Sequence, residues 1–426
     1  MTVASSDAVL EVVLNGQVIG DVQRTTPKKV RLRYTVESST VFTPLSVTMP
    51  GPTGRYREPV LSPWLDGLLP DRPETLRQWR RKFSLDDNSP TDSSTFALLR
   101  HVGEDVAGAA QFVRPERLDD VLSRGESLSA VSDSDIADML RRAQADLPVS
   151  TERGPNGKFS LAGAQAKIAL HLDEGTWSNP HGASPSTHIL KPAIPGMEDQ
   201  DLVEAVTMGT ARRLGLRTAA VEVAEFAGLR TLVVERYDRT RLPDGRWVRV
   251  HQEDMCQASA TPPFRKYESQ RGPGARKVAD LIATCSSEPE IDNRRFVQAL
   301  LFNWLICGTD AHARNYSIML NGRNVRLAPL YDVNSHLAYT SGAGSDLSMG
   351  VDGVFRASLV SRRRWIEEAP HLHVDPVWVD AEIDRQRSLI VESMHESAAV
   401  VNVSQYESPV VSRMVEETER WVARLG

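Results

Sequence analysis

The strongest constraint on this fold lies between residues 296 and 332, where polar side chains follow structural signals in a fixed order. Apolar residues recur at helical spacing over 296–307, and Gly308 is expected to end that helix. Asp310 and Asn315 follow five residues apart, and a predicted hairpin with an Asn-Gly turn then leads to Asp332. The order predicts a helix, a polar loop, a hairpin and a second acidic loop.

Two aspartates and one asparagine in this order form the layout that phosphoryl transfer requires. One aspartate orients the acceptor hydroxyl, the asparagine binds Mg²⁺, and the second aspartate bridges the metal ions. The offset from Asp310 to Asn315 equals that in the catalytic loop of protein kinases, and hard oxygen ligands suit Mg²⁺. Each residue alone is typical of a turn, but the ordered set predicts catalytic Asp310 with metal ligands Asn315 and Asp332. His312 either contacts phosphate or packs the loop.

Upstream segments supply candidate phosphate contacts. Small residues over 158–167 let backbone N–H groups approach phosphates, although the loop matches neither a Walker A motif nor GxGxxG and is also typical of a hairpin turn. An apolar strand ends at Lys191, which either holds phosphates or lies at a sheet edge with its head in solvent. Glu204, on a helix predicted over 202–214, either pairs with Lys191 or is an exposed helix glutamate.

A further segment, 231–239, reads as a buried strand that turns polar at its end. There the backbone groups of Glu235 and Tyr237 can meet adenine, and the carboxylate of Asp238 can meet ribose. By itself the segment is also an ordinary strand end.

The order of elements predicts an α+β fold with two lobes, divided into four parts. Residues 8–115 are expected to form a β-rich N-terminal subdomain, and residues 116–157 a polar linker with one helix. Residues 158–240 are expected to form the nucleotide-binding part. Residues 241–426 are expected to form a mainly helical catalytic lobe, in which one hairpin near 316–328 interrupts the helices that follow Asp254.

Within the first two parts, local signals predict individual elements. An Asn15-Gly16 pair predicts a hairpin turn. A strand over 30–34 is expected to be followed by another near Val47 and Met49. A helix is predicted near 133–145.

Composition narrows the class of protein. A chain of 426 residues is too long to fold around one ordinary hydrophobic core. The sequence contains no run of 18 apolar residues, so no transmembrane helix is predicted. The N-terminus lacks the features of a signal peptide. Three cysteines without a CxxC pair argue against a disulfide framework or zinc site and predict a cytoplasmic protein. A net charge of −6 means that any DNA contact needs a local basic patch or a partner.

Motifs along nearly the whole chain share the pattern of one protein family. They are WLDGLLP at 64–70, LLRHVGEDVAGA at 98–109, SLAGAQAK at 160–167, VERYDR at 234–239, HQEDMCQ at 251–257, GTDAHARN at 308–315 and LAPLYD at 327–332. With them the chain resembles the HipA family of bacterial toxin–antitoxin systems over about residues 10–390, in its long form with an N-terminal subdomain.

The resemblance implies a kinase-like fold distantly related to lipid kinases, and a serine/threonine protein kinase that uses ATP and Mg²⁺. It implies that Asp310 is catalytic, that Asn315 and Asp332 bind the metal, and that Ser160 is autophosphorylated. Nearly two added negative charges beside the ATP phosphates would expel the loop and inactivate the enzyme. The residues expected around the nucleotide are Ala162, Gly163, Ala164, Lys167, Lys191, Glu235, Tyr237, Asp238, Gln252, His312 and Tyr331.

The resemblance also implies partners. A helix-turn-helix antitoxin like HipB would bring the operator DNA contacts that this acidic chain lacks. The family's characterised targets are aminoacyl-tRNA synthetases, chiefly the glutamyl enzyme, whose phosphorylation causes growth arrest and persistence. The chain departs from the family pattern at Ala166, where Glu is frequent, and at Tyr237, where Phe is common. Residues 173–186 are expected to form a substrate-facing insertion.

Two other functions fit the same frame. A small-molecule or lipid phosphotransferase remains an alternative, because one fold hosts several chemistries. A non-catalytic co-repressor that binds a DNA-binding antitoxin is the other alternative. Such a protein does not need Asp310, Asn315 and Asp332 together, so the intact set favours an enzyme.

Overall fold

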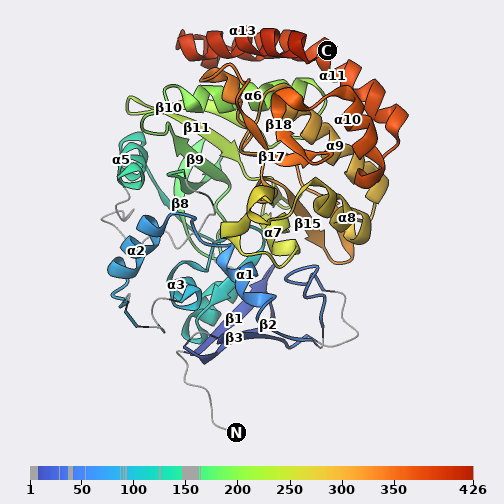
Figure 1. The fold of residues 1–426 in the computed structure, drawn as a ribbon. Helices are drawn as coiled ribbons and strands as arrows, with labels where there is room; N and C mark the ends of the chain where they lie inside the picture. The colour runs from blue at the N-terminus through green and yellow to red at the C-terminus, as the bar shows by residue number, and fades with distance from the viewer. Residues whose placement is uncertain are drawn as a thin grey trace.

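The computed structural model describes residues 8–27, 29–36, 42–52, 54–86, 88–89, 91, 94–123, 126–145, 163 and 165–425. Its β-rich first part lies at the bottom of Figure 1 and its mainly helical last part at the top. This mixture of sheets and helices confirms the α+β class. Ser160, Ala162 and Ala164, which were expected in the nucleotide loop, lie outside the described residues.

The first part is a five-stranded antiparallel sheet with short helices against it. In spatial order the strands are β4 (Arg55–Arg57), β3 (Lys29–Tyr34), β2 (Gln17–Thr26), β1 (Val9–Leu14) and β5 (Ala110–Val113), and the helices are α1 (Leu61–Asp66), α2 (Pro73–Lys82) and α3 (Thr95–Val102). Asn15 and Gly16 turn the chain between β1 and β2 with φ of 49° and 75°, so the predicted hairpin is confirmed. The prediction of a strand near Val47 and Met49 is wrong. The backbone N–H of Val47 donates to the carboxylate of Glu253, and β3 pairs with β4 instead.

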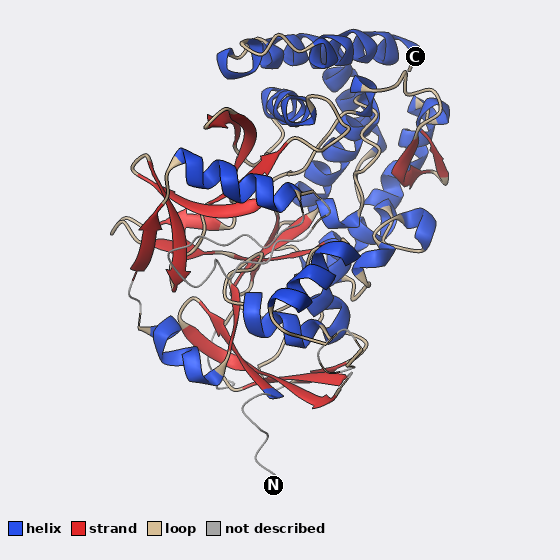
Figure 2. Ribbon diagram, turned by 90° about the vertical axis from the view of Figure 1, so that its left-hand side faces the viewer, coloured by secondary structure: helices blue, strands red, loops and turns tan. Residues whose placement is uncertain are grey.

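The second sheet has six antiparallel strands and carries one side of the site. In spatial order they are β10 (Val221–Phe226), β11 (Leu229–Glu235), β9 (His188–Pro192), β7 (Ile168–Asp173), β8 (Thr176–Gly182) and β6 (Glu126–Ala130). Because side chains alternate along a strand, α5 (Asp133–Gln144) packs on Val233 of β11, while α6 (Gln200–Arg213) packs on the neighbouring Leu232. The two helices therefore cover opposite faces of the sheet, as the turned view in Figure 2 helps to follow.

Two expectations about this region are corrected. Residues 116–157 were expected to be a linker with one helix, and the helix near 133–145 is confirmed as α5. The described residues also include α4 (Leu118–Leu122) and β6, which pairs with β8. The expected insertion at 173–186 is instead the turn and strand of β8 plus a loop whose Ser186 is fully buried and donates to Asp105.

The last part holds the helical core and several small sheets. Its helices are α7 (Met255–Ala258), α8 (Ala275–Cys285), α9 (Pro289–Leu305), α10 (Arg362–Glu368), α11 (Pro376–Ala398), α12 (Val401–Ser404) and α13 (Pro409–Arg424), and its strands are β12 (Arg239–Arg241), β13 (Trp247–Arg249), β14 (His251–Asp254), β15 (Ser317–Asn321), β16 (Asn324–Leu327), β17 (Asp346–Val351) and β18 (Val354–Arg356). The expectation of a single hairpin is wrong, because β17 and β18 form a second one after β15 and β16. Buried Trp304, Trp365 and Trp421 anchor the core.

Among the described residues, no helix combines the length and the apolar character that crossing a membrane requires.

Candidate active site

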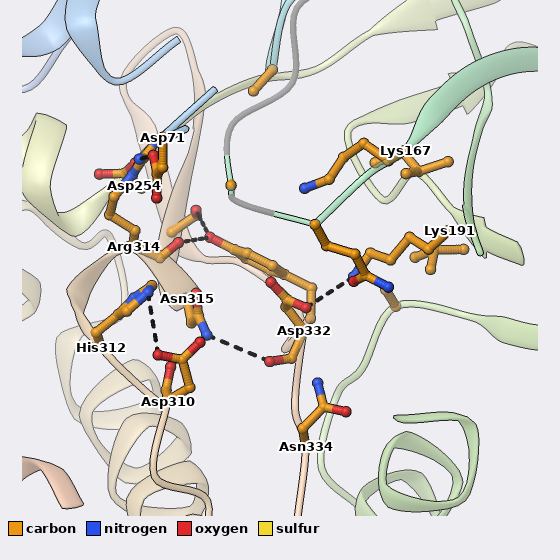
Figure 3. A pocket seen from close by; sticks show the side chains of 18 of the residues that line it. Asp71, Lys167, Lys191, Asp254, Asp310, His312, Arg314, Asn315, Asp332 and Asn334 are labelled. Carbon is orange, nitrogen blue, oxygen red and sulfur yellow. Dashed lines mark hydrogen bonds and ion pairs between the residues drawn. The ribbon is translucent and has the colours of Figure 1, made fainter. Parts of the chain in front are cut away.

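One cavity of about 410 Å³ gathers the predicted site residues from all parts of the chain. Figure 3 shows Asp310, His312 and Asn315 on one side of it and Lys167 and Lys191 on the other, with Asp332 between them. Every predicted nucleotide, metal and catalytic residue that the structure describes lines this cavity. Those residues are Gly163, Lys167, Lys191, Glu235, Tyr237, Asp238, Gln252, Asp310, His312, Asn315, Tyr331 and Asp332.

The loop that carries Asp310 begins with a turn at the end of α9 and is held by the side chain of Asn315. Cys307, and not Gly308, has the left-handed conformation that turns the chain out of the helix, with φ of 51°. Gly308 is needed for a different reason, since a Cβ there would overlap Oδ1 of Asn303. The amide Nδ2 of Asn315 then donates to the backbone carbonyls of Asp310 at 2.8 Å and Asp332 at 3.4 Å, which ties the two acidic loops together.

Asn315 and Asp332 present atoms that fit a hard cation. Both hydrogen bonds of the Asn315 side chain use its amide nitrogen, so its amide oxygen points away from the carbonyls of Asp310 and Asp332. Asp332 has φ of 57° and a partly exposed carboxylate that faces the cavity. In the described part of the chain, no group of three or more His, Cys, Asp and Glu side chains could hold a metal. Mg²⁺ needs no such group, because it keeps several waters and takes one or two carboxylates with phosphate oxygens.

Lys191 lies between two carboxylates. Its Nζ is 2.8 Å from Glu204 Oε1 and 2.9 Å from Asp332 Oδ1, so the ion pair predicted between Lys191 and Glu204 is present. Burial alone would lower the pKa of Lys191, but Asp332 and Glu204 outweigh it and raise that pKa above its usual value. Burial by contrast lowers the pKa of the nearby Lys167 to about 8, and the charge of Lys191 adds to this effect. Of these two lysines on the cavity wall, Lys191 is therefore held fully charged.

Two stacked tyrosines also line the cavity. The rings of Tyr237 and Tyr331 stack with centroids 5.6 Å apart, and the hydroxyl of Tyr237 donates to Gln252. The stacked rings offer a flat surface suited to a planar ring. The N–H of Glu235 is already used, since it donates to the carbonyl of Ala220.

Asp238 reaches the cavity wall but is largely engaged. Its Oδ2 accepts from the backbone N–H of Gly108 at 2.7 Å and from Nη2 of Arg236 at 2.9 Å, and the side chain is almost fully buried. Burial would raise the pKa of Asp238, but the neighbouring arginines hold it well below its usual value. The carboxylate therefore also holds the N-terminal part against the second sheet.

His312 is neutral in this setting. Burial lowers its pKa to about 4, and its Nε2 is 3.8 Å from Asp310 Oδ1. Its Nδ1 is buried and finds no hydrogen-bond partner among the described residues. The sequence left two roles open for His312, phosphate contact and packing of the loop. The structure is compatible with both, since the ring lies against the loop and on the cavity wall.

Sequence reasoning missed a contribution from the N-terminal part. Asp71, from the loop after α1, pairs with Arg314 and, at 3.0 Å, with Lys266 Nζ, and all three line the cavity. Its backbone N–H also donates to the carbonyl of Gly163 at 3.3 Å. No local pattern in the sequence signals that Asp71 pairs with residues so distant along the chain.

Sequence reasoning also missed a tyrosine beside the predicted catalytic residue. The hydroxyl of Tyr267 donates to Oδ1 of Asp310 at 2.6 Å. Tyr267 lies in an irregular segment between α7 and α8, for which the sequence offers no periodic signal.

Comparisons with known proteins agree along most of the chain. The model of the HipA N-terminal domain matches residues 10–113, and that of the HipA-like C-terminal domain matches residues 159–400. The protein named "Putative kinase Y4mE" of Sinorhizobium fredii is 33% identical over 336 residues, which are 78% of each chain. The "Serine/threonine-protein kinase toxin HipA" of Shewanella oneidensis is 28% identical over 371 residues, 81% of this chain and 79% of the relative.

A solved structure shares the fold. It is a complex of HipA, HipB and operator DNA from the toxin–antitoxin system of Shewanella oneidensis, and one of its chains matches with a TM-score of 0.80 at 24% identity. The match covers 97% of both chains, so the arrangement of the N-terminal sheet, the second sheet and the helical part is common to the two.

Proposed function

Because this chain belongs to the HipA family, we propose that it is a serine/threonine protein kinase that uses ATP and Mg²⁺ and acts as the toxin of a toxin–antitoxin module. The observation that carries the proposal is the convergence of Asp310, Asn315 and Asp332 on one cavity with the Lys191–Glu204 ion pair. A phosphotransferase needs these groups together, because its catalysis consists mainly of positioning and charge stabilisation.

In the proposed reaction, ATP lies with its base toward Tyr237 and Tyr331 and its phosphates toward Lys191 and the backbone near Gly163. Asp310 accepts the hydrogen bond of a serine hydroxyl on the protein substrate. A bond forms between that oxygen and the γ-phosphorus, the bond from the γ-phosphorus to the β,γ-bridging oxygen breaks, and the proton passes to the Asp310 carboxylate. Phosphoserine and ADP leave.

Mg²⁺, when bound, neutralises charge that develops on the phosphate oxygens. We propose that the oxygen of Asn315 and the carboxylate of Asp332 hold it. The same carboxylate contacts Lys191, whose fixed charge keeps Asp332 ionised and oriented toward the cavity. The hydrogen bond from the Asn315 amide to the backbone carbonyl of Asp332, at 3.4 Å, keeps the two proposed ligands side by side.

Regulation by Ser160 is part of the proposal. Ser160 lies three residues before Gly163, which the backbone of Asp71 binds at the edge of the cavity. A phosphate on Ser160 would add negative charge beside the phosphates of ATP and compete for Lys167 and Lys191. We expect that autophosphorylation at this serine inactivates the kinase.

For partners, we propose a HipB-like helix-turn-helix antitoxin, with operator DNA contacted mainly through it. The likeness to the solved complex of HipA, HipB and operator DNA supports this part of the proposal. The proposed targets are aminoacyl-tRNA synthetases in the cytoplasm, foremost the glutamyl enzyme, and their phosphorylation would cause growth arrest and persistence.

The proposal is tested by incubating the full chain with γ-labelled ATP and Mg²⁺ and each purified aminoacyl-tRNA synthetase. We expect label on a serine of one synthetase and on Ser160. Asp310→Gln should abolish both labels while ATP binding remains measurable. Asp346→Asn, at an exposed aspartate paired with Arg356 outside the cavity, should leave both unchanged. Full labelling by the Asp310 variant would overturn the proposal, and label on a lipid or small molecule instead would favour another phosphotransferase.

A further inference from the structure

The carboxylate of Asp310 has one fixed neighbour. The hydroxyl of Tyr267 donates to its Oδ1 at 2.6 Å, and within the described residues no other side chain hydrogen-bonds this carboxylate. Nε2 of His312 is 3.8 Å away, too far for a hydrogen bond. Otherwise the side chain of Asp310 is 66% exposed, so Tyr267 is the contact that selects its rotamer.

The backbone that presents Tyr267 is closed on itself. Over residues 265–274 the carbonyl of Tyr267 accepts from the N–H of Gly272 at 2.9 Å. A Cβ at Gly272 would overlap a carbonyl of the same loop, and a Cβ at Gly274 would overlap the carboxylate of Glu268. Two glycines at points of close approach therefore permit the tight path of this loop.

The ring of Tyr267 is also fixed from two sides. It meets the ring of His312 edge to face, with centroids 5.0 Å apart and planes at 81°, and Nζ of Lys266 lies 5.4 Å from its centroid. Partial burial raises the pKa of Tyr267, and the hydrogen bond to Asp310 raises it further. The phenol therefore stays protonated and donates throughout the neutral pH range.

We infer that Tyr267 is a positioning residue for phosphoryl transfer, whose hydroxyl holds Oδ1 of Asp310 and leaves Oδ2 to accept the hydroxyl of the protein substrate. The inference rests on the proposed function. A carboxylate has acceptor sites on both oxygens, so the two donors do not compete. A base oriented by a third group meets the substrate in a productive geometry.

The inference is tested in the full chain with Tyr267→Phe, assayed with labelled ATP and glutamyl-tRNA synthetase and by the chain's own labelling. We expect kcat to fall about ten- to hundredfold, the range expected when a hydrogen bond to an ionised group is lost. The KM for ATP and the melting temperature should stay unchanged, since the ring and its contacts remain. The matched control is Tyr406→Phe, whose ring packs on Arg230 at 4.9 Å outside the cavity.

The outcomes separate the two levels of the argument. An unchanged kcat in Tyr267→Phe would overturn the positioning role. A lower KM for the protein substrate would overturn it too, because the phenol would then compete with the acceptor hydroxyl for Asp310. A fall in ATP affinity or melting temperature that accounts for the lost activity would also overturn it. The double variant Asp310→Asn, Tyr267→Phe should label its substrate at the same rate as Asp310→Asn alone in single-turnover experiments. If the unchanged chain labels no protein, the proposed function itself fails.

Discussion

Arg314, in the same loop as Asp310, forms an ion pair with Asp71, which lies 243 positions earlier in the chain. Arg314 also donates to Asp254 at 3.1 Å and to the carbonyl of Gly67 at 2.7 Å. Burial would lower the pKa of Arg314, but these two carboxylates raise it. The N-terminal part thereby holds the loop that carries the proposed catalytic residue.

Asp71→Asn should lower both stability and activity. Removing one charge leaves the nearly buried Arg314 with Asp254 as its remaining charged partner, and Lys266 loses its ion pair. We expect the free energy of unfolding to fall by about 2 kcal/mol, measured by urea denaturation, and kcat to fall as the loop loosens. Asp120→Asn, which removes an exposed partner of Arg117, should change neither by a measurable amount. Wild-type kcat in Asp71→Asn would show that the loop needs no support from the N-terminal part.

Lys191→Met should be destabilising because it leaves Glu204 buried without its cation. We expect a loss of about 3 kcal/mol in the free energy of unfolding, together with a loss of phosphoryl transfer. The double variant Lys191→Met, Glu204→Gln should recover much of the stability but none of the activity, since the unpaired buried charge is gone while the phosphate contact is still missing. Denaturation and labelled-ATP assays on the same samples separate the two effects. Recovered activity in the double variant would contradict a role for Lys191 at the phosphates.

Glu253 should make stability depend on pH. It is buried between the N-terminal part and the helical part, where its oxygens accept from the N–H of Val47 and from Nε1 of Trp64, and burial raises its pKa to about 7. The folded chain therefore binds this proton up to about pH 7, whereas the unfolded chain releases it near its ordinary value. This contribution to stability is largest in acid and falls as pH rises toward 7.

Glu253→Gln tests that dependence. A glutamine side chain has only one acceptor oxygen, so either the N–H of Val47 or that of Trp64 would face its NH₂ group and lose its hydrogen bond. This loss costs the same stability at every pH. As pH rises from 5 to 8, the unchanged chain should lose about 2 kcal/mol of stability that the variant does not lose. The measurement is the free energy of unfolding of both proteins in urea at each pH. A difference that stays constant with pH would mean that Glu253 is ionised throughout.

Gly308→Ala should disturb the loop of Asp310 although Gly308 has no unusual φ. The added Cβ overlaps Oδ1 of Asn303, whose amide nitrogen is bonded to the carbonyl of Ala299 at 2.9 Å, so the side chain cannot simply move away. We expect a loss of about 2 kcal/mol and a lower kcat. Gly344→Ala is the matched control, since the nearest atom to its Cβ is 3.8 Å away. Equal stability of the two variants in thermal denaturation would contradict the close approach.

The sequence alone determined the parts of the site that depend on short-range order. Asp310 and Asn315 are fixed relative to one another by five residues of one loop, and a hairpin of few residues returns the chain to Asp332. Local signals likewise predicted the turn at Asn15, the helix α5 and the strand that carries Lys191. Such features follow from spacing and turn chemistry, which a linear pattern contains.

Only the tertiary structure decided which distant groups support these residues. Tyr267 lies 43 positions before Asp310, and Asp71 lies much further away, yet nothing in either local sequence distinguishes the two from ordinary loop residues. The strand misplaced near Val47 has the same cause, because a carboxylate from the second half of the chain takes its backbone N–H. Spacing within one element sets where a side chain points, but a contact between elements depends on how whole surfaces pack, and that information is spread over the entire chain.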